Sequence, residues 1–239
     1  MSTKVSILLP AYNESEIIDS ELPDFLRWME KEYKGVYEIV LIENGSTDGS
    51  YEKSLLLAKK FPTLWVYHRD KAEFGGSVLE AIERAKGEVS VLLNADWLDR
   101  DFVKLAVKQI KGYDIVIGSK VLNAHTDHRP LIRRMASHSL TFVLKTFFGF
   151  SFSDSHGLKC FRTSSIQPLA IQCKMNEIVE SELLLLAQLY KLKITEVPVA
   201  ITEMRAPRVS FAKRILSMGT ELVKLYRTRK EHLRALPRR

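Results

Sequence analysis

The 239-residue sequence contains only two cysteines, Cys160 and Cys173, and neither has Cys or His neighbours at metal-ligand spacing. This scarcity argues against a disulfide framework and a zinc ribbon, and it favours a reducing compartment. Glycine and proline are also few, at 11 and 8 residues, which excludes collagen-like and low-complexity chains. A chain of this length buries roughly 70% of its unfolded surface, so it needs no covalent or metal staple.

Long apolar runs are missing as well. No segment reaches the roughly 18 consecutive apolar residues that indicate a membrane-spanning helix. The first residues, M-S-T-K-V-S-I-L-L-P-A-Y-N-E, become polar too soon for a signal peptide. We therefore expect a cytoplasmic protein without a spanning helix.

Positive charge is concentrated at the C-terminal end. The chain has a net charge of +7, and residues 205–239 contain 11 Lys and Arg but only 2 Glu. A basic tail favours phosphates, nucleic acid or an anionic membrane face, although a solvated helix face has the same composition. Because the tail carries no recognised nucleic-acid motif, we expect no nucleic-acid partner.

The first 120 residues alternate short apolar runs with helical patterns. The expected strands are 5–10, 37–42, 64–68, 89–94 and 114–119, and the expected helices are 17–33, 51–60, 76–86 and 101–111. Nearly continuous apolar strands are typical of a sheet that is covered on both faces. The alternation predicts an α/β fold with a mostly parallel, Rossmann-like central sheet flanked by helices.

The pattern changes after Ser119. Residues 131–150 and 177–190 have helical patterns, and 157–162 and 194–201 have the character of short strands. Residues 210–236 predict one or two basic amphipathic helices.

Polar loops follow three of the predicted parallel strands: P-A-Y-N-E at 10–14, E-N-G-S-T-D-G-S at 43–50 and N-A-D at 94–96. Ligands of open parallel sheets bind outside the carboxyl ends of the strands, so these loops are expected to converge on one crevice. The glycine-rich fingerprint of dinucleotide folds is missing after the first strand, and so is the P-loop pattern. The ligand is therefore expected to bind without a glycine-rich phosphate loop there.

Six motifs occur in order along the chain: S-I-L-L-P-A-Y-N-E, I-E-N-G-S-T-D-G-S, L-L-N-A-D-W, G-S-K, S-D-S-H-G-L-K-C-F-R and I-T-E-V-P-V. Together they resemble the motifs of the inverting GT-A glycosyltransferases of family 2. The dolichyl-phosphate mannosyltransferase-like branch is the most similar one. The resemblance extends from about Val5 to Val199. It implies a catalytic, nucleotide-sugar-binding GT-A domain at 1–204 and a basic helical tail at 205–239.

The resemblance also implies where the donor binds. Pro10, Tyr12 and Glu14 would line the pocket for the base and the ribose. Glu43 and Asn44 stand where the family has Asp-Asp, and the Asn44 oxygen can still accept a hydrogen bond from the base.

The metal motif departs from the family pattern. Asn94 and Asp96 occupy the positions of the family's Asp-x-Asp, which chelates Mg²⁺ or Mn²⁺, and Leu98 replaces a common Gln. Because hard cations prefer carboxylates, a site with Asn94 in place of the family's first Asp is expected to bind the cation more weakly. Two possibilities stay open: a weakly held divalent cation, or cationic side chains that neutralise part of the diphosphate charge.

Three such cations are implied by the resemblance. Lys120 takes the place of an Arg at the end of a G-S-R strand, Arg133 matches an Arg that contacts the acceptor phosphate, and Arg205 matches an Arg that reaches the donor phosphates. The family's later Ser-Lys pair is Ser210-Phe211 here, so one expected Lys is missing.

The function implied is transfer of a hexose, mannose or glucose, from a GDP- or UDP-linked donor to a polyprenyl or dolichyl phosphate, with inversion. Asp96, Lys120, Arg133 and Asp154 are the candidate catalytic residues. A phosphate acceptor needs no strong general base, whereas a glycan hydroxyl would need one, for which Asp154 and Glu182 are candidates. A non-catalytic relative that only binds nucleotide-sugar is the third alternative.

Membrane contact has its own signals. Residues 140–150 are rich in phenylalanine and the tail is basic, and stable peripheral binding takes two such signals. We expect a peripheral protein on the cytosolic membrane face, either by itself or with a membrane-anchoring subunit.

Overall fold

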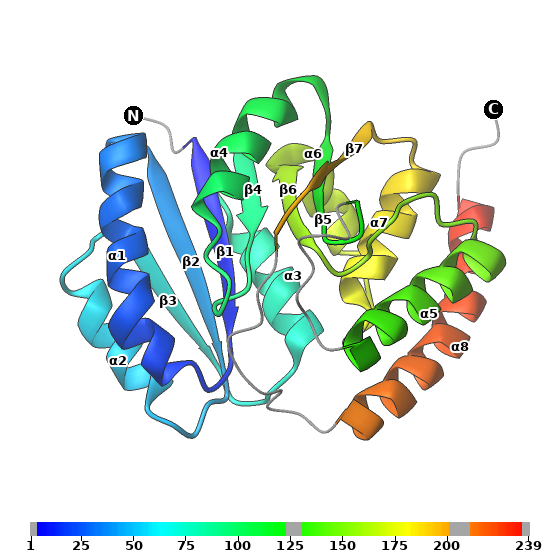
Figure 1. Ribbon diagram of the computed structural model, residues 1–239, viewed down its shortest axis with the longest axis horizontal. Coiled ribbons are helices and arrows are strands. Elements are labelled where there is room, and N and C mark those ends of the chain that lie inside the picture. The colour runs from blue at the N-terminus through cyan, green and yellow to red at the C-terminus, as the bar shows by residue number, and fades with distance from the viewer. Residues whose placement is uncertain (1–3, 123–130, 201–210, 236–239) are drawn as a thin grey trace.

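The computed structural model describes residues 4–122, 131–200 and 211–235, except for the side chains of 132–133, 211–215 and 229–235 (Figure 1). Its first half follows the predicted alternation closely. The elements are β1 (Val5–Ala11), α1 (Ser15–Tyr33), β2 (Tyr37–Asn44), α2 (Ser50–Ala58), β3 (Leu64–Arg69), α3 (Phe74–Arg84), β4 (Val89–Leu92), α4 (Arg100–Gln109) and β5 (Ile115–Ser119). β4 ends two residues earlier than expected because the chain turns there, and Asn94 forms an isolated bridge with Trp97.

The second half differs more from expectation. Its elements are α5 (Leu131–Phe148), β6 (Leu158–Arg162), α6 (Thr163–Ala170), α7 (Val179–Leu189), β7 (Ile194–Pro198) and α8 (Phe211–Ala235). Helix α6 was not predicted, since it begins with Thr-Ser-Ser and contains Pro168, features that also mark loops. The described part of the basic tail forms one continuous helix, α8.

The described strands form a seven-stranded sheet in the order β3-β2-β1-β4-β6-β5-β7. Every neighbouring pair is parallel except those made by β6, which lies antiparallel between β4 and β5. The prediction of a mostly parallel α/β sheet flanked by helices is confirmed. The position of β6 was not predicted, because strand order depends on contacts between distant segments.

Helices cover both faces of the sheet, as Figure 1 shows, and the strand alternation divides the core accordingly. Leu8 and Val40 face α3 and the helices α5 to α8, whereas Ile7 and Leu41 face α1, α2 and α4. This packing fixes the carboxyl ends of β1, β2 and β4 at one edge.

Helix α8 lies beside α5 (Figure 1) and packs on the body of the protein. Leu225 is buried, and the Tyr226 ring meets the Phe148 ring edge-on at 6.1 Å between centroids. Within the part of the chain that the structure describes, no helix is both long and apolar enough to cross a bilayer.

Candidate donor and phosphate site

The loops that follow β1 and β2 are joined by hydrogen bonds. The backbone N–H of Asn13 donates to Ser46 Oγ at 2.9 Å, and the Asn13 side-chain oxygen accepts from the Thr47 N–H at 2.8 Å. The N–H of Glu14 donates to Ser50 Oγ at 2.8 Å. Two of the three polar loops expected at the crevice therefore do converge.

Pro10 lies near the end of β1, and Tyr12 and Glu14 lie in the loop that follows this strand. All three are partly exposed. Their positions leave them accessible at the carboxyl edge of the sheet. Their contact with a donor remains a prediction.

Glu43 and Asn44 end β2 and are both buried. One Glu43 carboxylate oxygen accepts the Ser46 N–H at 2.5 Å, and the other pairs with His68 Nδ1. The Asn44 side-chain oxygen accepts the Glu73 N–H at 3.0 Å, next to the start of α3. Both side chains therefore make contacts within the protein. The side-chain oxygen of Asn44 has two lone pairs, so it can accept a second hydrogen bond.

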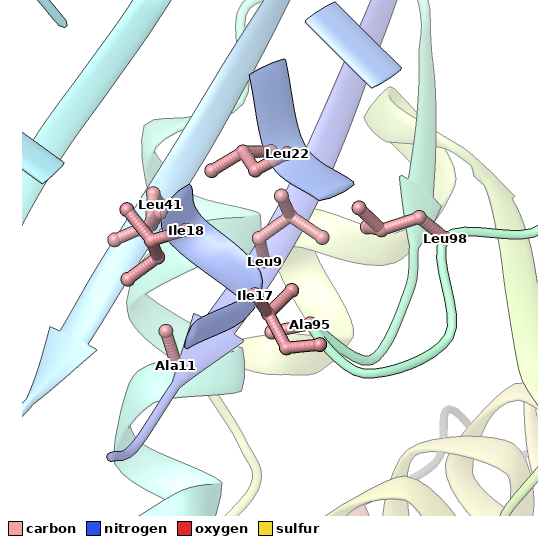
Figure 2. Close-up of a pocket in the computed structure, with 8 residues that line it drawn as sticks. All are labelled: Leu9, Ala11, Ile17, Ile18, Leu22, Leu41, Ala95 and Leu98. Atoms are coloured by element: carbon pink, nitrogen blue, oxygen red, sulfur yellow. The ribbon is translucent and has the colours of Figure 1, made fainter. Parts of the chain in front are cut away.

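The loop after β4 alternates between buried and exposed side chains. Asn94 and Asp96 are exposed, whereas Ala95 and Leu98 line a small apolar pocket with residues of β1, β2 and α1 (Figure 2). The apolar pair thus fixes the loop against α1. Leu98, the residue expected to replace a Gln, offers no ligand and packs into this apolar pocket.

The donor set of this loop is one carboxylate, from Asp96, and one amide oxygen, from Asn94. No group of three His, Cys, Asp or Glu side chains suited to a metal occurs among the residues described. Mg²⁺ is commonly held by one or two carboxylates together with substrate phosphates. The residues therefore fit a cation that is completed by a diphosphate, and they do not form a cage of protein ligands alone.

Lys120 and Asp154 form a buried ion pair on the other side of this loop. Both are about 4% exposed, and Lys120 Nζ lies 3.1 Å from Asp154 Oδ2. Lys120 Nζ also donates to the His156 carbonyl at 2.6 Å and lies 6.0 Å from the Trp97 ring centroid. We call Lys120, Asp154 and His156 the Lys120 cluster.

The environment of Asp154 keeps it ionised. Burial alone would raise the pKa of its carboxyl, but the charge of Lys120 and the His156 N–H outweigh burial and lower the pKa to about 2. A carboxylate with so low a pKa is a weak proton acceptor near neutral pH.

Two glycines allow the segments of this cluster to approach each other. A Cβ on Gly157 would lie 1.9 Å from the carbonyl oxygen of Gly118, which is closer than atoms can approach. Gly118 itself is packed against Phe102 and Val199. The glycines of the G-S-K and D-S-H-G motifs are thus required by this contact between β5 and the segment before β6.

A family model described as glycosyl transferase family 2 matches residues 6–158, more than half of the sequence. The chain belongs to glycosyl transferase family 2. The match spans the loops after β1, β2 and β4 and the Lys120 cluster. The expectation of a glycosyltransferase enzyme from this family is confirmed.

Relatives of this family 2 glycosyltransferase cover most of its length. A dolichyl-phosphate β-glucosyltransferase of Trichomonas vaginalis is 25% identical over 94% of this chain and 73% of its own length. A Drosophila melanogaster protein of the same name is 27% identical over 94% of this chain and 75% of its own length. A dolichol-phosphate mannosyltransferase of Pyrococcus furiosus is 28% identical over 59% of this chain and 40% of its own length.

Solved structures of other transferases share the fold. A mannosyltransferase of Pyrobaculum calidifontis, in complex with GDP-Man and Mn²⁺, superimposes with a TM-score of 0.65 at 17% identity, over 97% of this chain and 65% of its own. Mannosyl-3-phosphoglycerate synthase of Rubrobacter xylanophilus gives 0.67 at 14% identity, over 99% and 77%. At these identities the likeness confirms the GT-A type of fold only.

Four of the residues expected near the phosphates cannot be placed. Arg205 and Ser210 lie outside the described residues, and so do the side chains of Arg133 and Phe211. Their roles at the phosphates remain predictions.

Glu182 lies in the first turn of α7 and contacts the segment that precedes this helix. It is 1% exposed, and its Oε2 accepts the N–H groups of Lys174 and Met175, each at 2.8 Å. Burial raises the pKa of this carboxyl, against those two N–H groups. Oε2 therefore holds the backbone in front of α7, while the buried Oε1 has no hydrogen-bond partner among the described residues.

Sequence analysis missed Glu196. This residue of the E-V-P motif accepts hydrogen bonds from the N–H and the hydroxyl of Ser153, at 2.9 and 2.7 Å. Ser153 in turn bonds Ser119 at 2.6 Å and directly precedes Asp154. The motif could have signalled this role, because a charged residue in a strand next to the site needs a partner.

Proposed function

We propose that this family 2 enzyme transfers a hexose, mannose or glucose, from a nucleotide-sugar to a polyprenyl or dolichyl phosphate. The observation that carries the choice of acceptor is the buried Lys120–Asp154 pair. The ion pair engages Asp154 with Lys120 and so disfavours it as the base that a hydroxyl acceptor would need, and one Glu182 oxygen is bound by backbone N–H groups. The names of the Trichomonas, Drosophila and Pyrococcus relatives support the same acceptor.

The proposed reaction needs no proton acceptor. An acceptor phosphate oxygen attacks the anomeric carbon, the new oxygen–carbon bond forms, and the bond from that carbon to the donor diphosphate breaks with inversion. The nucleoside diphosphate leaves with the electron pair. Catalysis then depends on positioning and on stabilising charge at the leaving diphosphate.

The donor would bind at the carboxyl edge of the sheet. We assign the base and ribose to Pro10, Tyr12, Glu14, Glu43 and Asn44. The loop contacts described above support this assignment, since they bring the ends of β1 and β2 together. Arg205 is assigned to the donor phosphates and Arg133 to the acceptor phosphate, both from the family pattern.

Asn94 and Asp96 would hold a divalent cation, Mg²⁺ or Mn²⁺, together with the donor diphosphate. Such a cation supplies charge neutralisation for the leaving group. The exposed positions of both side chains support this role, and the Pyrobaculum neighbour was solved with Mn²⁺. Lys120 Nζ lies 6.0 Å from the centroid of the Trp97 ring of this loop, and the Asp154 carboxylate balances its charge.

We place the enzyme peripherally on the cytosolic membrane face, by its own surface or with an anchoring subunit. Exposed apolar side chains on α5 and α8 support this placement: Leu131, Met135, Phe142, Phe147, Leu216 and Val223. Exposed Lys145, Lys224 and Arg227 lie on the same two helices. Apolar and basic side chains together suit an anionic membrane surface.

A donor screen tests the proposal. Purified protein and a polyprenyl phosphate in detergent are supplied with GDP-mannose, UDP-glucose or UDP-N-acetylglucosamine, each with Mg²⁺, with Mn²⁺ or with a chelator. We expect metal-dependent transfer from a hexose donor. Nucleotide binding, seen by calorimetry, without transfer from any donor would overturn the lipid acceptor and support a hydroxyl acceptor or the non-catalytic alternative.

A further inference from the structure

Residues 174–178, between α6 and α7, form a segment whose backbone is held by two carboxylates. Glu182 accepts its first two N–H groups, as described above. Glu221, on α8, accepts the next three, from Asn176, Glu177 and Ile178, at 3.0, 2.8 and 3.1 Å. One side chain from the C-terminal helix therefore fixes the backbone in front of α7.

The 174–178 segment touches α3 beside Asn44, in the part of the crevice that we assign to the donor base and call the donor side. The Asn176 side-chain oxygen accepts the N–H of Gly75, in the first turn of α3, at 2.7 Å. A Cβ on Gly75 would lie 2.5 Å from the Met175 carbonyl oxygen, so this turn of α3 rests directly on the segment. Two residues earlier, the Glu73 N–H holds Asn44.

The same segment touches the Lys120 cluster, which we call the phosphate side of the crevice. His156 Nε2 lies 3.3 Å from the Glu177 carbonyl oxygen, and the His156 backbone binds both Lys120 and Asp154. The segment thus contacts two groups of residues from different parts of the sequence: the start of α3 beside Asn44, and the Lys120 cluster. Glu221 is the residue of α8 that joins it by three hydrogen bonds.

We propose that Glu221 is a positioning residue for the transferase reaction. It sets the 174–178 segment, and through that segment it sets the distance between Asn44 on the donor side and the Lys120 cluster on the phosphate side. The inference rests on the proposed function, because it assumes that a nucleotide-sugar spans this distance. Catalytic sites lose rate when such distances shift by about 1 Å.

Hydrogen exchange in the protein without ligands gives the first test. In Glu221→Ala, we expect faster exchange at the amides of Asn176, Glu177 and Ile178, and also at Gly75 and Lys120, which Glu221 does not touch. Faster exchange at 176–178 alone would overturn the proposal, because Glu221 would then only cap α7. Gly219→Ala, two residues away in open space on the same helix, is the matched control and should leave all these amides unchanged.

Affinity for UDP and GDP, measured by calorimetry with Mg²⁺, gives the second test. Glu221→Ala should weaken binding of the nucleotide that the wild type prefers by roughly tenfold, and Glu221→Gln, which keeps one accepting oxygen, should lie between. Gly75→Ala perturbs the same contact from the α3 side and should give a similar loss even if Glu221→Ala fails to fold. Unchanged affinity in folded Glu221→Ala and Gly75→Ala would overturn the proposal.

The two proposals fail in different ways. Wild-type protein that binds neither nucleotide would contradict the proposed function. The exchange pattern would still decide whether Glu221 couples the two sides.

Discussion

The donor side and the phosphate side of the crevice are built with different interactions. On the donor side, the loops after β1 and β2 are joined mainly by hydrogen bonds that involve backbone N–H groups, as at Asn13 and Ser46. On the phosphate side, buried ion pairs hold the segments: Lys120 with Asp154, and Lys159 with Glu180 at 2.5 Å. The joined segments are about equally far apart in sequence on both sides, 33 residues for Asn13 and Ser46 and 34 for Lys120 and Asp154. The difference is burial: the partly exposed loops are joined by polar contacts, whereas the buried segments are joined by paired charges.

Removing one charge from the phosphate side should have the largest effect. Asp154→Ala leaves the Lys120 ammonium buried without its carboxylate, which costs about 3–5 kcal/mol. We expect a loss of that size in the free energy of unfolding, measured by urea denaturation. The double variant Lys120→Met/Asp154→Leu removes both charges and should recover at least half of the loss. Equal stability of wild type and Asp154→Ala would contradict the account of the ion pair.

A change at the exposed loop between the two sides should affect activity and leave stability unchanged. Asp96→Ala removes the one carboxylate of the proposed cation site, and the rate of transfer should fall by roughly 100-fold or more. Because Asp96 is exposed, the urea midpoint should stay close to that of wild type. Wild-type turnover in this variant would contradict the assignment.

Restoring the family's acid at the neighbouring position sharpens that result. Asn94→Asp adds a second carboxylate, so the Mn²⁺ concentration needed for half-maximal activity should decrease. An unchanged requirement would show that Asn94 does not face the cation.

The stability that the Lys120–Asp154 pair contributes should decrease at acid pH. The pKa of Asp154 is about 2 in the folded protein, below the value of about 3.9 for an unfolded chain. Its contribution, on the order of 2 kcal/mol, is therefore complete above about pH 5 and is lost as pH falls toward 2. Urea denaturation between pH 3 and 7 should show less acid destabilisation in Asp154→Asn than in wild type. Identical slopes would contradict this linkage.

The smallest effect is expected on the donor side. Asp48 accepts the Ser15 and Ser50 N–H groups, both at 3.0 Å. Asp48→Ala should cost about 1 kcal/mol of unfolding free energy, because the N–H groups that begin α1 and α2 lose a side-chain acceptor. Thr47→Ala, whose backbone contact does not depend on its side chain, is the control. A loss as large as that of Asp154→Ala would remove the contrast between the two sides.

The first half of the fold could be read from the sequence because its signals are local. The strand at 37–42 and the helix at 17–33 were expected within a few residues of β2 and α1. Apolar runs, polar loops and their order are properties of neighbouring residues, and parallel β-α units leave few alternatives for pairing. The convergence of the loops after β1 and β2 followed for the same reason.

The second half could not be read in the same way. Nothing local in L-K-C-F-R places β6 antiparallel between β4 and β5, and nothing local in α8 places Glu221 against 174–178. Both depend on contacts across many residues of sequence.

Local patterns along the chain were enough to predict the α/β class, the family and the polar loops at the strand ends, because periodicity and motif order are properties of neighbouring residues. Folding is what pairs Asp154 with Lys120, binds Glu182 to the backbone in front of α7, and places Glu196 and Glu221 against the segments around the site. These contacts could not be predicted because they depend on burial. A carboxylate acquires its pKa and its partners from the groups that folding packs around it, and those groups come from distant parts of the chain.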